Sequence, residues 1–222
     1  MGSTIEFSRP DGKGAPGYLA EADARNAPGV VMLEEWWGVN DEIKATADRL
    51  AGEGFRVLVP DLFRGRVAAT GDEANHMAQG LDFADAASQD AAGAAAFLSK
   101  GGTKTAVTGY CMGGALAMLA AMHSKAFHSA VVYYGYPPPQ AGDPATIRIP
   151  FMGHWAIHDE FFKIEGVDAI EEKLKVAKAP YEFYRYDAKH AFANPKGLGN
   201  YDSNAAETAW RRSVGFFHRT LG

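Results

Sequence analysis

The stretch Val107–Gly114, Val-Thr-Gly-Tyr-Cys-Met-Gly-Gly, constrains the fold of this chain more than any other. A strand-like run leads into Gly-x-Cys-x-Gly-Gly, and a helical run of small residues follows directly. A nucleophile on such a sharp strand-to-helix turn needs small residues two positions to either side, here Gly109 and Gly113. Cys111 is the only cysteine in the chain, and a lone cysteine is often a buried core residue. The glycines and the strand–turn–helix order favour a nucleophile over a core cysteine.

The composition is that of an ordinary globular protein, and its 222 residues suit a single domain, 1–222. The net charge is −5, and no basic patch is interleaved with aromatic residues, so nucleic acid is not expected as a partner. No apolar run is long enough to span a bilayer, and Met1–Glu6 lacks the features of a signal peptide. One cysteine cannot form an internal disulfide. We therefore expect a cytoplasmic protein without a membrane partner, either a monomer or a weak homodimer.

Strand-like and helix-like segments alternate along the chain. The strands are expected at 4–8, 17–21, 30–33, 55–59, 104–108, 128–134, 149–155 and 181–186. The helices are expected from Asn40 or Asp41 to about 52 and at 82–98, 115–122, 166–178 and 204–221, with irregular stretches at 61–80, 136–148 and 190–200. This order predicts an α/β fold with a mostly parallel sheet, helices on both faces and an antiparallel N-terminal edge.

A cysteine nucleophile needs a base beside it, and in folds with this turn the order along the chain is nucleophile, acid, histidine. The chain has seven histidines. His190 alone follows the last predicted strand and precedes the last helix. We therefore predict that His190 is the base.

The acid that orients the base should follow the strand at 149–155. Asp159 fits that position, and Glu160 is the fallback. Asp143 comes before the strand, and Asp187 belongs to a different loop. We predict Asp159.

His154-x-x-x-His158-Asp159 resembles a metal-binding spacing. Histidines four residues apart converge on one metal ion when they lie on a helix, whereas this segment leaves a predicted strand. No metal site is expected.

Acyl transfer needs N–H donors directed at the developing oxyanion. One donor is expected from Met112, which follows the nucleophile, and the other from the loop Glu35-Trp36-Trp37-Gly38. Glu34 and Glu35 are unexpected here, because a carboxylate repels developing negative charge. Either both are solvated, or one turns inward and takes the proton of the thiol.

Several segments together resemble the dienelactone hydrolases, which are α/β-hydrolases with a cysteine nucleophile. They are Glu35–Asn40, Val59–Leu62, Gly109–Gly114, Val132–Gly135, Asp159 and His190–Phe192. The resemblance covers nearly the whole chain and implies the α/β-hydrolase fold.

By this resemblance Cys111 is the nucleophile, with His190 and Asp159 as its partners. Glu35 corresponds to a glutamate that contacts the resting thiol and deprotonates it when substrate binds. The resemblance implies Trp36 and Met112 as the oxyanion donors. It also implies hydrolysis of enol-lactones, such as dienelactone to maleylacetate, through a thioester that water opens, with no cofactor.

The chain departs from the family pattern at two arginines that bind the substrate carboxylate. The position four residues after His190 is Asn194, and 72–77 contains no arginine. Arg64 or Arg66 either substitutes for them or is a solvated surface charge. We take Trp37, Tyr134, Asn194 and Arg64 as candidate substrate contacts.

These observations predict a hydrolase that cleaves a small ester or lactone through a Cys-His-Asp triad. The alternative is a protein of the same fold whose reactive thiol binds or senses electrophiles without efficient turnover. A peptidase or a thioesterase with the same triad is a third possibility.

Overall fold

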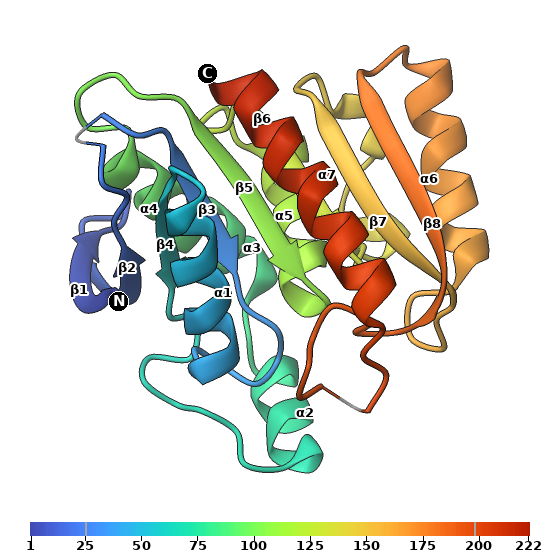
Figure 1. Ribbon diagram of the computed structural model, residues 1–222, viewed down its shortest axis with the longest axis horizontal. Coiled ribbons are helices and arrows are strands. Elements are labelled where there is room, and N and C mark those ends of the chain that lie inside the picture. Colours follow the sequence, from blue (N-terminus) through green and yellow to red (C-terminus); the bar gives the residue numbers. More distant parts are fainter. Residues whose placement is uncertain (25, 198) are drawn as a thin grey trace.

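The structure is a computed structural model that describes residues 1–24, 26–197 and 199–222 (Figure 1). The predicted loop 190–200 includes Leu198, which lies outside the described residues.

Within the described part of the chain, eight strands form one sheet in the order β1-β2-β4-β3-β5-β6-β7-β8. The strands are β1 Ser3–Ser8, β2 Gly14–Ala20, β3 Gly29–Leu33, β4 Arg56–Pro60, β5 Thr105–Tyr110, β6 Ser129–Tyr133, β7 Phe151–His158 and β8 Tyr181–Lys189. The β1–β2 and β2–β4 pairs are antiparallel, whereas the pairs from β4 to β8 are parallel. The predicted mostly parallel sheet with an antiparallel N-terminal edge is confirmed.

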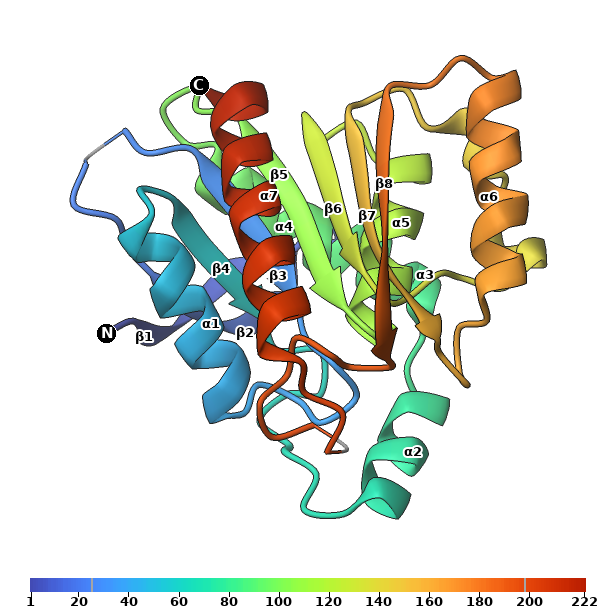
Figure 2. The same cartoon turned by 45° about the vertical axis from the view of Figure 1, so that its right-hand side comes forward.

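Helices cover both faces of this sheet. The helices are α1 Asp41–Gly52, α2 Gly71–Gln79, α3 Phe83–Asp85, α4 Ala91–Leu98, α5 Met112–His123, α6 Ile164–Val176 and α7 Ser203–Leu221, with a π-helical turn at Ala86–Asp90 and 3-10 turns at Pro139–Ala141 and Pro144–Thr146. Apolar side chains of α1 and α7 pack on one face, and those of α4, α5 and α6 pack on the other (Figures 1 and 2).

Strand β3 shows why the sequence folds this way. All five of its residues are buried. Because side chains alternate along a strand, Val31 and Leu33 join the core on one face, while Val30 and Met32 join the core on the other. The following helix begins at the Asn40 cap, whose side chain accepts hydrogen bonds from two N–H groups of the first turn of α1.

The prediction that 61–80 is irregular throughout is wrong, because the segment contains α2. Thr70 caps this helix, and Ala74 and Met77 are its buried residues. Two buried positions in nine residues leave little helical periodicity in the sequence. Figures 1 and 2 show α2 beyond the carboxyl ends of the strands, at the bottom of each view.

The predicted helix 82–98 is divided by the π-helical turn Ala86–Asp90. This turn places the carboxylate of Asp90 inside the protein, where the residue is 2% exposed.

Across the described residues, no helix is both long enough and apolar enough to cross a membrane.

Candidate active site

Cys111 lies on a sharp turn between β5 and α5. Its backbone has φ 54° and ψ −117°, which is rare for a residue with a side chain. Two hydrogen bonds hold it: its N–H donates to the carbonyl of Tyr133 (3.0 Å), and its carbonyl accepts from Ala115 (3.1 Å). The neighbouring strand β6 and the first turn of α5 therefore support the strained residue.

The two predicted glycines are required by close backbone approach. A Cβ atom on Gly109 would overlap the carbonyl of Gly113, and one on Gly113 would overlap the carbonyl of Leu33. The turn therefore packs directly against the end of β3, as the spacing of the glycines predicts.

The three residues predicted to act together meet in the structure. His190 Nδ1 lies 2.8 Å from Asp159 Oδ2, and His190 Nε2 lies 3.1 Å from the Cys111 sulfur. They come from the ends of three strands: Cys111 follows β5, Asp159 follows β7 and His190 follows β8. The fallback residue Glu160 is exposed.

The hydrogen bonds set the tautomer of His190. A carboxylate only accepts, so Nδ1 carries the proton, and Nε2 is left to accept from the thiol. The other oxygen of Asp159 accepts from the N–H groups of Phe161 and Phe162, both at 2.8 Å. Asp159 is thus held by its own loop and holds His190 in turn.

Aromatic rings surround His190. Tyr134 meets it edge to face at 5.2 Å between ring centres, and Phe162 stacks on it at 5.6 Å. The ring centre of Phe161 lies 4.9 Å from that of His190, and Phe161 is 61% exposed. One of the rings beside the imidazole is therefore accessible to solvent. Of these rings the sequence singled out Tyr134 alone, as a candidate substrate contact. Phe161 and Phe162 were not identified, although their position next to Asp159 places them in the acid's loop.

The thiol is partly buried. Burial, and next the nearby Glu35 carboxylate, raise the pKa of Cys111 well above its usual range, while the N–H of Met112 acts in the opposite direction. The raised pKa favours the protonated thiol over the thiolate.

Glu35 is buried and its hydrogen-bond partner is Asn194, whose side-chain amide donates to Oε2. Burial raises the pKa of Glu35, and the Asn194 amide partly opposes this. The thiol contact that the family resemblance implies for Glu35 is not among the hydrogen bonds of the described residues, in which the sulfur contacts His190 instead.

Glu34 is also buried, on the opposite face from Glu35. One of its oxygens accepts from the N–H of Leu62 at 3.0 Å, and burial raises its pKa well above the usual range. Both carboxylates are therefore buried, and each has its own hydrogen-bond partner in a different loop.

The expected oxyanion donors lie in two different segments of the site. Met112 is the first residue of α5, and its N–H lies close enough to the sulfur to affect the pKa of the thiol. Trp36 follows Glu35 in the loop after β3 and packs edge to face with Trp37 at 5.4 Å. That loop is tied to the next one, because the carbonyl of Trp37 accepts from Ala68 (3.0 Å).

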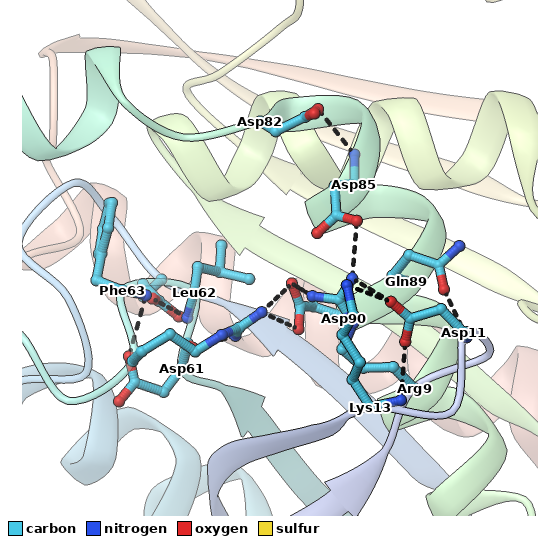
Figure 3. Close-up of polar contacts among 12 residues, drawn as sticks. Arg9, Asp11, Lys13, Asp61, Leu62, Phe63, Asp82, Asp85, Gln89 and Asp90 are labelled. Carbon is cyan, nitrogen blue, oxygen red and sulfur yellow. Dashed lines mark hydrogen bonds and ion pairs between the residues drawn. The ribbon is translucent and has the colours of Figure 1, made fainter.

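Arg64, a candidate substrate contact, is engaged elsewhere. Its guanidinium binds both oxygens of Asp90, at 2.8 and 2.9 Å. Asp90 also lies 3.4 Å from Arg9, which reaches Asp11 and Asp85 as well (Figure 3). Arg64 thereby joins the loop after β4 to the π-helical turn and to the N-terminal hairpin. Arg66 is exposed and lines a surface pocket with His76 and Met77.

The two histidines of the metal-like spacing have separate partners. His154 is fully buried between the hydroxyls of Tyr186 (2.8 Å) and Ser213 (2.9 Å), and burial lowers its pKa to about 3. His158 is exposed and lies 2.7 Å from Asp187.

Comparison with known proteins agrees with the geometry. Residues 15–221 match the dienelactone hydrolase family. The protein usf of Aquifex pyrophilus is 32% identical over 100% of both chains. The carboxymethylenebutenolidase of Rhodococcus opacus is 29% identical over 98% of this chain and 92% of its own. A solved structure of a dienelactone hydrolase-like promiscuous phosphotriesterase from metagenomic libraries superposes with a TM-score of 0.86, at 23% identity, covering 100% of this chain and 99% of that one.

Proposed function

Because the chain belongs to the dienelactone hydrolase family and is an ester or lactone hydrolase, we propose that it acts through a thioester on Cys111. The observation that carries this proposal is the chain of contacts from Asp159 through His190 to the Cys111 sulfur. The substrate is a small molecule with a carbonyl that the thiolate attacks.

The first half of the reaction forms the acyl-enzyme. His190 Nε2 takes the thiol proton, and the sulfur adds to the substrate carbonyl. The N–H groups of Met112 and Trp36 stabilise the oxyanion, together with the N-terminal end of α5. The intermediate collapses when the C–O bond breaks, and His190 returns the proton to the leaving oxygen.

The second half releases the product. Water attacks the thioester carbonyl while His190 takes a proton from it, and the thiolate leaves and is reprotonated. The net change is addition of one water across the ester or lactone bond. The triad supplies every proton transfer, so no cofactor is part of the proposal.

Glu35 has a supporting role in this scheme. Burial, and next the Glu35 carboxylate, raise the pKa of the thiol, so Glu35 adds to the effect of burial in favouring the protonated sulfur. The family resemblance implies an alternative first step, in which substrate displaces the Asn194 contact and Glu35, in place of His190, accepts the thiol proton. The later proton transfers remain with His190.

The test measures hydrolysis of dienelactone and p-nitrophenyl acetate by the wild type, Cys111→Ala and Cys111→Ser. We expect turnover by the wild type and a loss of about 10³-fold or more in Cys111→Ala, since removing the nucleophile of such a triad leaves only the background of the oxyanion site. Mass spectrometry of the quenched reaction should show an acyl adduct on Cys111.

Equal activity in the wild type and Cys111→Ala would reject the thioester. A reactive-thiol sensor predicts a different pattern: rapid alkylation of Cys111 by iodoacetamide with no turnover across a wide panel of esters, lactones, thioesters and peptides.

A further inference from the structure

Helices α1 and α7 cover the same face of the sheet (Figures 1 and 2). Residues of both helices line a cavity of about 230 Å³. Neither Cys111 nor His190 is among the described residues that line it. Glu35, Tyr134 and Asn194 do line it, so the cavity adjoins the candidate active site through these side chains. One ordered water needs roughly 15 Å³ of such space, so the cavity is large enough for a small organic molecule.

Aromatic rings form much of the cavity wall. They are Tyr110, Tyr133, Tyr134, Tyr201 and Trp210. Tyr110 stacks on Tyr133 with ring centres 4.5 Å apart. The guanidinium of Arg49 lies 4.1 Å from the centre of the Trp210 ring, so this wall already holds one cation.

The charged residues that line the cavity are mostly acidic. Glu35, Glu42 and Glu207 contribute carboxylates, and Arg49 contributes the guanidinium. Arg49 is already neutralised by Glu207 at 2.7 Å. Lys196 pairs with Glu42 from an exposed position, which leaves the buried Glu35 without a cationic side chain as its hydrogen-bond partner among the described residues. The wall therefore complements a positive ligand.

Two buried polar atoms in this wall make no well-aligned hydrogen bond among the described residues: Glu35 Oε1 and the Tyr134 hydroxyl, which lies near enough to Glu35 to lower the pKa of that carboxyl. Buried polar atoms are nearly always hydrogen-bonded, by protein or by something bound. A ligand hydroxyl or ammonium group in the cavity would supply the missing bonds.

We propose that this cavity is a second ligand site that takes a small hydroxylated organic cation, with Glu35 shared between the cavity and Cys111. The aromatic rings contact the cation, and its hydroxyl bonds to Glu35 or Tyr134. The inference goes beyond ester hydrolysis and does not depend on it, because binding is measured without turnover.

Ligand binding in the cavity should lower the pKa of the Cys111 thiol. Burial, and then the Glu35 carboxylate, raise the pKa of Cys111. A bound cation offsets the charge of Glu35 and so favours the thiolate. At a fixed pH below that pKa, lowering the pKa of Cys111 by half a unit raises the thiolate fraction, and with it the rate of alkylation, about threefold.

The experiment titrates the wild-type protein with choline chloride by calorimetry, against 3,3-dimethylbutan-1-ol, which has the same shape without the charge. Sodium chloride at matched ionic strength is the salt control. We expect choline to bind roughly tenfold more tightly than the alcohol, in line with a desolvated cation–π contact. Choline should also raise the rate of Cys111 alkylation by iodoacetamide about threefold or more.

Two variants and one control locate the binding. Ala206→Phe fills the cavity from α7 and should abolish choline binding, whereas Asn204→Phe on the exposed side of α7 should not. Glu207→Gln removes one lining carboxylate without adding bulk and should weaken choline about threefold while leaving the alcohol unchanged. Ester turnover of each variant is followed separately, so loss of the cavity site is distinguishable from loss of the triad.

Equal binding of choline and the alcohol, binding that persists in Ala206→Phe, or no choline binding to the wild type would each overturn the proposal. If Ala206→Phe fails to fold, the Glu207→Gln comparison still decides it.

Discussion

The side-chain amide of Asn194 donates a hydrogen bond to the buried carboxylate of Glu35, and so joins the loop after His190 to the loop after β3. An amide in this position leaves the carboxylate without an ionic partner. The family resemblance implies an arginine there, so the contact bears on both substrate charge and the state of Glu35.

Replacing this amide by a cation should change substrate preference. Asn194→Arg places a guanidinium beside Glu35, where it can also bind a substrate carboxylate. A charged hydrogen bond contributes about 1.5–3 kcal/mol, so kcat/KM for dienelactone should rise roughly tenfold relative to neutral p-nitrophenyl acetate. Asn194→Gln, which adds length without charge, is the control. The idea fails if Asn194→Arg changes both substrates by the same factor.

The carboxylate that orients His190 should be needed for catalysis. Asp159→Asn keeps an oxygen for the two N–H groups of its loop but removes the charge that faces Nδ1. General-base catalysis typically contributes 10²–10⁴-fold, so kcat/KM should fall by about that factor. The exposed neighbour Glu160 supplies the matched control, and Glu160→Gln should stay within about twofold of the wild type. A larger loss in Glu160→Gln than in Asp159→Asn would reassign the acid.

His154 should make the protein less stable in acid. Burial lowers the pKa of His154 from 6.5 to about 3. Between these pH values the unfolded chain therefore binds a proton at His154, whereas the native protein does not. The free energy of unfolding therefore falls as the pH drops from about 6.5 towards 3, by up to about 1.4 kcal/mol per pH unit from this residue. Its contribution is fully present above pH 6.5.

Urea unfolding between pH 4 and 7 measures this slope. His154→Gln keeps a buried polar group between Tyr186 and Ser213 but does not titrate, so its stability should depend less on pH than that of the wild type. Parallel curves for the two proteins would show that His154 is not the source.

The ion pairs around Asp90 should contribute more to stability than exposed pairs. Asp90 is 2% exposed and faces both Arg64 and Arg9 (Figure 3). Asp90→Asn leaves the buried Arg9 short of a counter-charge and should cost about 3 kcal/mol. Asp168→Asn removes an exposed partner of Arg185 and should cost about 1 kcal/mol or less. Equal unfolding free energies for the two variants would contradict this difference.

Local sequence patterns predicted most of the strands and helices, and they singled out Cys111, Asp159 and His190, whose side chains the structure brings into contact. Gly109 and Gly113 mark the turn because no other residue fits between two backbones, and the order of acid and histidine after Cys111 follows the order of the strands. Strand β3 was predictable because it is apolar throughout. The helix α2 was missed because only Ala74 and Met77 of its residues face the core.

The partners of polar side chains were harder to predict. The carboxylate of Glu34 accepts a hydrogen bond from Leu62, and that of Glu35 accepts one from Asn194. Both donors belong to loops that are distant in the sequence. Asp90 reaches Arg64 because a π-helical turn shifts the register of its helix, and no periodicity in the sequence signals such a turn. Contacts of this kind depend on how loops dock after the sheet has formed.

The residues of the proposed triad follow strands that differ in burial. Cys111 follows β5 in the interior of the sheet, whereas His190 follows β8, an edge strand that is only partly buried. Transient opening of that edge would remove the base from an intact nucleophile. We therefore expect that heating abolishes hydrolytic activity before the central strands unfold. Cooling should restore the activity as β8 pairs again with β7.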